Sequence, residues 1–449
     1  WPPTTFKQGI VMGWLHLWGP ALLMVALLAL QTPITWALAI AAGGFFWLNV
    51  EMMPLSTFAQ QISEGANSVS LLALPLFVLA GCIMNAAGIT RRLMGLAEVM
   101  VGHMTGALAQ MCTVLGTLLG GLTASANADA AMLAKTIGQE MVKHGYDRPF
   151  AAVITASAAI ITALLPPSIG LIIYGFLTES SIGRLFAAGI VPGLMLALGL
   201  LITTHFVARR RGYKPQREKR ASFKEGSVVL RDGLLALSVP VVIFVGTRYG
   251  LFTVTESGAI IVLYVLMIAI YGYREMKWRD LPNLLAEAVR DASVVMMMIC
   301  AAASFGFYLT WEQVPQNMSG WLTEVSNDPL TLLLLINLTL LLLGMVIEGS
   351  AALIILTPML LPVIEAAGIN KVHFGIVVIT NLTIGGMSPP VGGLMYISSQ
   401  VLRVRMGEFA VESLPYLLMM IGLLVLLSVF PQISLWLPNL IYGVEGASI

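Results

Sequence analysis

The chain has 449 residues, of which 58% are hydrophobic and only 10% are charged, and its formal net charge is +1. A soluble domain carries about 25% charged residues, so this chain has too few charges to solvate a large surface. The balanced charge also argues against a nucleic-acid-binding protein, because no basic domain is present to neutralise phosphates. The composition therefore predicts a multi-pass membrane protein.

Apolar runs long enough to cross a bilayer, roughly 20 residues each, recur from end to end. In chain order they are about 12–30, 33–50, 68–89, 184–208, 227–249, 254–274, 290–310 and 413–437. The three cysteines lie inside apolar segments without paired spacing, so we interpret Cys82, Cys112 and Cys300 as small hydrophobic residues and not as disulfide or metal partners. The chain begins with Trp1, which indicates processing or further residues upstream.

An internal repeat is visible at an offset of 223 residues. The matched pairs include two Pro-Pro dipeptides and keep a constant register over more than fifty residues, which predicts a structural duplication. They are Pro166-Pro167 with Pro389-Pro390, Gly170-Leu171 with Gly393-Leu394, Gly145 with Gly368, Phe186-Ala187 with Phe409-Ala410, Pro192 with Pro415, and Gly199 with Gly422.

The number of crossings between the two copies predicts that they are inverted. Five crossings separate the start of the first Pro-Pro segment, near 149, from the start of the second, near 372. Lys and Arg concentrate in 209–226, 272–290 and 403–412, and are absent from 291–370. The positive-inside rule places these basic loops in the cytoplasm, and both termini then come out periplasmic. Inverted repeats are a common plan of secondary transporters.

Each copy contains one segment that is awkward as a simple spanning helix. Residues 108–140 enter and leave on the cytoplasmic side, which predicts a re-entrant hairpin with its tip near Thr123–Asp129. The partner hairpin is 330–366, with a tip at Glu348-Gly349-Ser350. Non-helical backbone at membrane depth is tolerated only where it lines a cavity or is buried in protein.

The Pro-Pro dipeptides predict that the helices 149–178 and 372–402 are broken, because proline removes a backbone donor and clashes with the preceding turn. A break frees carbonyl groups that can coordinate a cation, and it exposes N–H groups that favour an anion. Uncharged side-chain oxygens, which hard cations take as ligands, collect at the four predicted breaks. They belong to Ser125, Asn127, Ser168, Ser350, Asn381 and Ser388.

Two carboxylates lie at the predicted hairpin tips, where ionisable groups are expensive and suggest function. Asp129 either caps the returning arm of the first hairpin or takes part in the site. Glu348 is expected to line a substrate or ion cavity. The chain contains no GxxxxGK[ST] loop, so hydrolysis of ATP by that route is not expected.

These segments resemble the large M subunit of the tripartite ATP-independent periplasmic (TRAP) transporters. The resemblance is carried by GGLTASANADAAMLAKTIGQEMVKHGYDRPFAAVITASAAIITALLPPSIG (120–170), by LGMVIEGSAALIILTPMLLPVIEAAGINKVHFGIVVITNLTIGGMSPPVGG (343–393) and by LALPLFVLAGCIMNAAGIT (72–90). It covers nearly the whole chain and implies sodium-driven uptake of a small organic anion across the bacterial inner membrane by an elevator mechanism. The implied partners are a small Q subunit and a periplasmic binding protein. Na⁺ is the only implied cofactor, as the coupling ion.

The resemblance also implies site residues. Substrate would bind near Ser125, Asn127, Ser168 and Glu348. The implied sodium ligands, in two sites at the tips and breaks, are Thr123, Ser125, Pro166, Pro167, Ser350, Asn381, Ser388, Pro389 and Gly392. One departure concerns the first tip, where relatives often have Gly between two serines and this chain has Thr123-Ala124-Ser125. The predicted periplasmic N-terminus fits members in which the small subunit is fused upstream.

The resulting domain division separates a scaffold from a transport domain. We assign 1–66 to N-terminal scaffold helices, 67–107 to a scaffold helix and a cytoplasmic arm, 108–183 to the first transport half, 184–310 to scaffold helices with a basic loop at 209–226, 311–402 to the second transport half, and 403–449 to a C-terminal scaffold helix.

Three other functions make requirements that differ from those of a TRAP large subunit. A stand-alone sodium–dicarboxylate symporter has similar hairpins but needs no binding protein. An intramembrane protease would need a Ser–His or paired-Asp arrangement, and neither GxSG with a membrane histidine nor GxGD is present. A pure scaffold or channel subunit is excluded only by accumulation coupled to an ion gradient.

Overall fold

The computed structural model describes residues 18–444 except 31, 121, 122, 124, 218, 219, 318, 319, 321–325 and 327. Every regular element in these described ranges is a helix. Seven of the described helices are long and apolar enough to cross a membrane. Shorter apolar helices accompany them, including Trp18–Ala29 and the first arm of each predicted hairpin. The all-α membrane fold with two hairpins and two broken helices is therefore confirmed.

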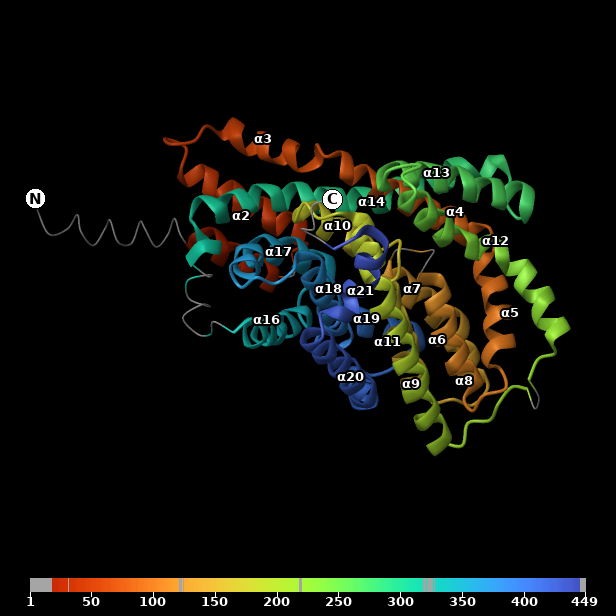
Figure 1. The fold of residues 1–449 in the computed structure, drawn as a ribbon. Helices are drawn as coiled ribbons and strands as arrows, with labels where there is room; N and C mark the ends of the chain where they lie inside the picture. The colour runs from red at the N-terminus through yellow and green to blue at the C-terminus, as the bar shows by residue number, and fades with distance from the viewer. Residues whose placement is uncertain are drawn as a thin grey trace, which may run out of the picture.

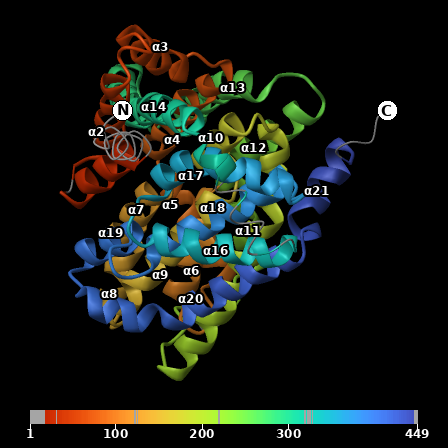
Figure 2. The same ribbon diagram turned by 90° about the vertical axis from the view of Figure 1, so that its left-hand side faces the viewer.

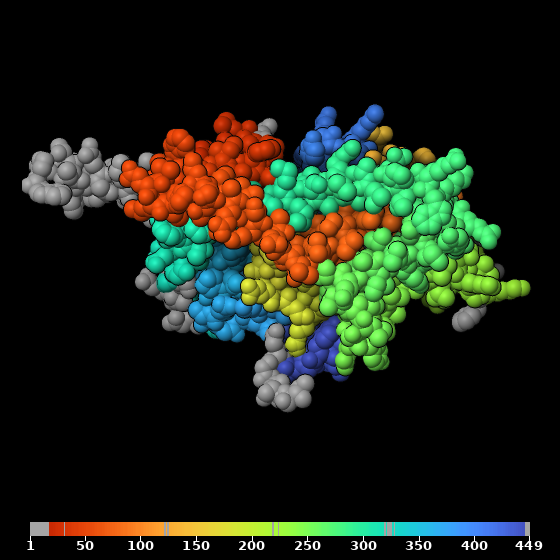
Figure 3. All heavy atoms as spheres, turned by 90° about the horizontal axis from the view of Figure 1, so that it is seen from above, coloured from red at the N-terminus to blue at the C-terminus, as the bar shows by residue number. Residues whose placement is uncertain are grey.

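One group of helices forms a layer along the top of Figure 1, and Figure 2 shows the same layer from the side. In these helices α14 packs against α2, α3 and α4, and α13 packs against α4 and α12. In the view from above, their red-orange and green-to-teal segments lie side by side and cover this face (Figure 3). The helices of this layer are α2 (Ile34–Leu48), α3 (Leu55–Ala66), α4 (Ala73–Ala86), α12 (Phe223–Arg248), α13 (Val254–Met267) and α14 (Leu281–Trp311).

The two repeats form a second group beneath this layer (Figure 1). The first repeat consists of α6 (Ala107–Gly120), α7 (Ala126–Leu133), a π turn (Ala134–Gly138), α8 (Gln139–Lys143), α9 (Arg148–Ile160), a 3₁₀ turn (Ile161–Ala163) and α10 (Ile169–Leu177). The second consists of α16 (Pro329–Gly344), α17 (Gly349–Ala366), α18 (Lys371–Met387) and α19 (Gly393–Leu402).

The predicted breaks lie at the Pro-Pro dipeptides in both repeats. Helical structure stops at Ala163 and resumes at Ile169, and it stops at Met387 and resumes at Gly393. Both Pro–Pro peptide bonds are cis. The repeat register is also visible at Gly145 and Gly368, which both follow a hairpin with φ of 83° and 68°. Glycine adopts this left-handed conformation without the cost of a Cβ.

Helices associate here through small residues, because a lipid environment gives little hydrophobic drive for one helix to bind another. A Cβ added to Gly116 of α6 would lie 2.6 Å from the carbonyl oxygen of Ala158 in α9. In the second repeat, a Cβ on Gly385 of α18 would lie 2.7 Å from the backbone of Gly344 in α16. The first hairpin arm of each repeat therefore touches the broken helix backbone to backbone.

The C-terminal part differs from its prediction in two ways. The expected single helix of 413–437 is two helices, α20 (Met406–Val429) and α21 (Gln432–Tyr442). The interruption follows from Pro431, since the residue before a proline is disfavoured in the α conformation, and Phe430 has φ −120° and ψ 80°. In addition, α20 and α11 (Ile182–Arg210), which we expected in the scaffold, both pack against the repeat helices α9 and α18, and α11 also packs against α6.

The two groups are joined on the side predicted to be cytoplasmic by α5 (Ile89–Val101) and by the segment after α11. Helix α5 contacts both α6 and α12. The Gly102 carbonyl at its end accepts the backbone N–H groups of Gln216 and Arg217 at 3.1 and 3.0 Å. The Arg217 side chain pairs with Glu98 and Glu225 at 3.0 and 2.6 Å. These bonds anchor the basic connection to the arm.

A candidate binding cavity at the helix breaks

A cavity of about 460 Å³ lies where the two repeats meet the upper layer. Most of its lining comes from the hairpin tips and the helix breaks of the repeats. The upper layer supplies the remaining wall, from the start of α2 and the middle of α14. These upper-layer residues are Pro33, Ile34, Thr35, Val294, Val295 and Met298.

Four of the repeat helices begin at this cavity. The first turns of α7, α10, α17 and α19 all contribute lining residues. The first N–H groups of a helix have no intrahelical partner, and the helix dipole adds a partial positive charge at this end. The main chain therefore contributes partial positive charge to the cavity at four helix starts.

Three of these helix starts are capped by polar side chains that also line the cavity. Ser125 Oγ accepts the Ala128 N–H at 3.4 Å, and Ser168 Oγ accepts the Leu171 N–H at 3.5 Å. Glu348 caps α17 through a 3.0 Å bond from the Ala351 N–H. The fourth helix, α19, begins after a glycine and has no side-chain cap. Each cap fixes where its helix starts, and Ser168 Oγ also donates a 2.7 Å hydrogen bond to the Ala163 carbonyl before the break.

The charge of the lining is unusual for a site expected to hold an anion. Glu348 is the one ionisable side chain among the described residues that line the cavity, and no Lys, Arg or His is among them. Its second oxygen accepts a 3.1 Å hydrogen bond from Ser350 Oγ. Any anion bound here would be held by main-chain N–H groups, hydroxyls and amides, without a cationic side chain of the described lining.

A buried carboxylate ties the first hairpin tip to the first break. Asp129 is 1% exposed, and its Oδ2 accepts hydrogen bonds from Thr123 Oγ1 at 2.5 Å and Thr162 Oγ1 at 2.6 Å. Thr123 belongs to the tip, and Thr162 lies in the last turn before the break. Asp129 therefore does not cap α7, a role that Ser125 has. It joins two segments that are 33 residues apart in the chain.

The second tip and break are joined by main-chain contacts. The Gly392 N–H donates to the Met345 carbonyl at 3.1 Å. Deeper in the repeat, Asn381 Nδ2 donates to the Asn337 carbonyl and to Asn337 Oδ1 at 2.8 and 3.0 Å. Asn381 Oδ1 is buried and has no hydrogen-bond partner among the described residues. A buried carbonyl oxygen without a donor is available to a cation.

The predicted site residues separate into two sets. The substrate candidates Ser125, Asn127, Ser168 and Glu348 all line the cavity, together with the ion candidate Ser350. The other ion candidates do not line it and lie at the tips and breaks around it or deeper in α18: Thr123, Pro166, Pro167, Asn381, Ser388, Pro389 and Gly392. Ala124, the departure noted at the first tip, lies outside the described residues.

Sequence reasoning missed the part of the lining that lies outside the repeats. Thr35 and the α14 residues are contributed by segments interpreted as ordinary crossings. Pro33, which interrupts the apolar run before α2, was the available signal, since it resembles the proline breaks inside the repeats. Thr383 of α18 was also missed.

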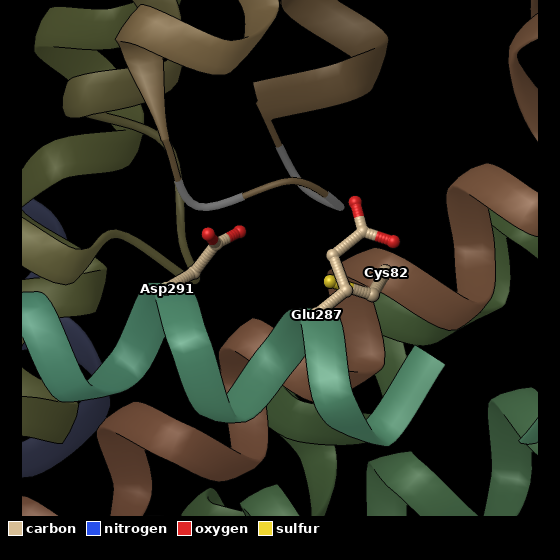
Figure 4. A group of neighbouring side chains, drawn as sticks. All are labelled: Cys82, Glu287 and Asp291. Atoms are coloured by element: carbon tan, nitrogen blue, oxygen red, sulfur yellow. The ribbon is translucent and has the colours of Figure 1, made fainter. Parts of the chain in front are cut away.

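One group outside the cavity could hold a metal ion by geometry. Cys82 of α4 faces Glu287 and Asp291 of α14, and the three possible ligand atoms lie within 4.8 Å of one another (Figure 4). Both carboxylates are exposed. The sequence places Cys82 in an apolar segment, and the fold brings two acidic side chains of α14 close to it.

Comparisons with known proteins bear on the whole chain. Residues 21–433 match the family model "Tripartite ATP-independent periplasmic transporter, DctM component". The sialic acid TRAP transporter large permease protein SiaM of Vibrio cholerae is 38% identical, covering 97% of this chain and 99% of that protein. The 2,3-diketo-L-gulonate TRAP transporter large permease protein YiaN of Escherichia coli is 36% identical, over 90% and 95%.

A third relative and a solved structure extend these findings. The C4-dicarboxylate TRAP transporter large permease protein DctM of Pseudomonas aeruginosa is 35% identical, over 85% of this chain and 89% of that protein. The crystal structure of the YdaH transporter of Alcanivorax borkumensis superposes with a TM-score of 0.65 at 15% identity, over 93% of this chain and 99% of that one. At that identity the likeness concerns the fold alone.

Proposed function

The chain belongs to the DctM family, the large permease component of the tripartite ATP-independent periplasmic transporters, and from this premise we propose that it carries out sodium-coupled uptake of a small organic anion. Its curated relatives are named as transport permeases, not as enzymes. Their names give sialic acid, a diketo sugar acid and C4-dicarboxylates as substrates, all of which carry a carboxylate. A carboxylate is therefore the substrate feature we propose.

The observation that carries the proposal is the cavity at the four helix starts. Its main-chain N–H groups and its Ser125, Asn127 and Ser168 side chains suit a carboxylate. Because the described lining contains no cationic side chain, a bound anion can be released without breaking a strong ion pair. Glu348 borders the same space and limits how much negative charge it accepts.

Sodium coupling is supported by the oxygen groups beside the cavity. At the first break, the proposed site uses Thr123, Ser125 and carbonyl groups freed by Pro166-Pro167, next to the buried Asp129 carboxylate. At the second, the proposed ligands are Ser350, Asn381 and the Ser388-Pro389-Gly392 break. The unpartnered Asn381 Oδ1 supports this second site. Oxygen atoms from side chains and main chain are the ligands that hard cations prefer.

The division of the helices into two groups supports an elevator mechanism. We assign the repeats, together with α11 and α20, to the moving body, because these helices pack on one another. The layer of α2–α4 and α12–α14 is the static part, and α5, whose end is bonded to Gln216 and Arg217, links the two groups. This assignment differs from the expectation that 184–310 and 403–449 belong to the scaffold, because it gives α11 and α20 to the moving body.

The proposed partners follow from the tripartite family. A periplasmic binding protein delivers the anion, and a small membrane subunit packs on the static layer. That layer presents large apolar side chains to its surroundings, among them Trp47, Val69 and Leu263 at 71%, 73% and 63% exposure. We propose that the basic connection after α11 lies in the cytoplasm, as the positive-inside rule predicts, and that the membrane is the inner membrane.

The experiment is uptake into proteoliposomes that contain this chain, its small subunit and its cognate binding protein, across a library of organic anions. An inward sodium gradient is compared with potassium and with protons. Accumulation that needs both sodium and the binding protein supports the proposal and identifies the substrate. Uptake without the binding protein would favour a stand-alone sodium–dicarboxylate symporter, and uptake indifferent to sodium would overturn the coupling.

A further inference from the structure

The cavity has two walls that belong to different groups of helices. The polar groups at the starts of α7, α10, α17 and α19 belong to the repeats. The opposite wall belongs to the upper layer and is apolar along α14, where Val294, Val295 and Met298 line it. Thr35 is the one residue of that upper wall, among the described lining, with a side-chain hydroxyl.

The position of Thr35 follows from a proline in the sequence. Pro33 ends the preceding turn and α2 starts at Ile34, so Thr35 is the second residue of the helix. The Thr35 side chain is half-buried and makes no hydrogen bond to another side chain of the described residues, unlike Ser350 on the opposite wall. Thr35 lines the cavity beside side chains that are otherwise apolar on this wall: Pro33, Ile34, Val294, Val295 and Met298.

We propose that Thr35 is a substrate-selecting residue of the static wall, which donates a hydrogen bond to the bound anion in only one of the two end positions of the moving body. The proposal rests on the elevator assignment made above. The repeats carry their polar groups with the substrate as they move, whereas Thr35 stays behind. The substrate therefore meets the Thr35 hydroxyl on one side of the membrane and loses it on the other.

A one-sided contact has a defined consequence for transport. It makes the affinity for the anion different at the two faces, independently of the sodium sites, which lie inside the repeats. A hydroxyl on the static wall also selects among anions, because a substrate that cannot place an acceptor opposite Thr35 leaves it unpaired. The apolar α14 surface beside it offers such a substrate no replacement donor.

The test compares Thr35→Val, which keeps the shape and removes the hydroxyl, with Thr35→Ser, which keeps the hydroxyl. The matched control is Thr57→Val in α3, which also follows a proline at the helix start but does not line the cavity. Half-saturating substrate concentrations are measured in right-side-out and in inverted vesicles, with sodium dependence measured in parallel.

Thr35→Val is expected to raise the half-saturating concentration about tenfold to a hundredfold at one face, the effect of one lost hydrogen bond to a charged group. The other face should change less than about twofold, a difference within the scatter of neutral surface substitutions. Thr35→Ser and Thr57→Val should resemble the parent. Unchanged affinity at both faces would show that Thr35 does not donate a hydrogen bond to the anion. An equal change at both faces would show that it donates in both end positions, which overturns the proposal.

A second readout does not depend on turnover. Thr35→Cys is placed in a chain whose Cys82, Cys112 and Cys300 are replaced by alanine, and its reaction with a maleimide is followed. Saturating substrate with sodium should slow the labelling, and sodium alone should not. Equal labelling with and without substrate would overturn the proposal. If the parent chain shows no sodium-driven uptake at all, the proposed function fails first, which the parent assay reveals separately.

Discussion

The two repeats follow one backbone plan but hold their hairpin tips in place by different chemistry. In the first repeat, a buried carboxylate joins tip to break through two hydroxyl donors, Thr123 and Thr162. In the second, the equivalent of Thr162 is Gly385, whose backbone touches Gly344. The first repeat thus relies on side-chain hydrogen bonds where the second relies on close contact of bare backbone.

The relation is reversed one turn deeper in each repeat. The second repeat has the hydrogen-bonded pair Asn337–Asn381, while the position equivalent to Asn381 in the first is Ala158, packed on Gly116. Each repeat therefore has one hydrogen-bonded polar contact, or polar tie, and one close contact of small residues. The polar tie lies near the break in the first repeat and one turn deeper in the second. A duplicated fold needs the same distances between its helices and not the same residues, so the weak points of the two halves differ.

The largest effect is expected at the polar tie of the first repeat. Asp129→Ala removes the acceptor of two buried hydrogen bonds and leaves two hydroxyls without it, so the free energy of unfolding should fall by about 2–4 kcal/mol and uptake should fall to background. Thermal unfolding of the purified chain measures the first effect. The control is Asp328→Ala, which removes an exposed cap of α16 and should cost about 1 kcal/mol. Equal losses in the two variants would contradict the proposed tie.

The close contact of the second repeat should tolerate no added atom. Gly385→Ala places a Cβ about 2.7 Å from the backbone of Gly344, which forces α16 and α18 apart at a cost of about 1–3 kcal/mol. Uptake should fall severalfold and the unfolding temperature should drop. Gly407→Ala is the matched control, because nothing lies within 4 Å of a Cβ built there. A Gly385→Ala chain as stable as the control would show that the contact is loose.

The deeper polar tie of the second repeat separates a structural role from an ion-binding role. Asn381→Ala removes the unpartnered Oδ1 as well as the hydrogen bond, and it should raise the half-saturating sodium concentration about tenfold, equivalent to one lost ligand of about 1.4 kcal/mol. Asn337→Ala weakens the same tie but keeps Asn381 Oδ1. It should lower stability and leave sodium dependence unchanged. Equal sodium dependence in both variants would argue against Asn381 as a ligand.

Much of this architecture was predictable because proline and glycine constrain the backbone directly. The Pro-Pro dipeptides located both breaks, and the constant offset of 223 residues located the hairpins. The family resemblance implied a substrate site near Ser125, Asn127, Ser168 and Glu348, and these four residues line one cavity.

The sequence does not predict contacts between segments that no repeat or motif relates to each other. Thr35 lines the cavity, although it belongs to an apolar run whose length predicts an ordinary membrane-spanning helix. The partners of Asp129 lie on either side of it in the chain, and only the folded hairpin brings Thr162 close. The packing of α11 against the repeats cannot be predicted from hydropathy, because an apolar helix has the same hydropathy pattern in either group.

The smallest effect is expected at Glu348, where the two repeats differ in the cap that faces the cavity. Its counterpart at the first tip is the uncharged Ser125. Glu348→Gln keeps an oxygen that can accept the Ala351 N–H, so α17 should start where it does now and stability should change by less than about 0.5 kcal/mol. Removing one negative charge beside a bound anion, in an exposed setting, should lower the half-saturating substrate concentration about twofold to threefold.

Glu348→Ala, which also loses the cap, should instead destabilise the chain by about 1 kcal/mol. A rise in the half-saturating concentration for Glu348→Gln would contradict the charge-limiting role, because it would mean that the carboxylate accepts a hydrogen bond from a donor group on the substrate.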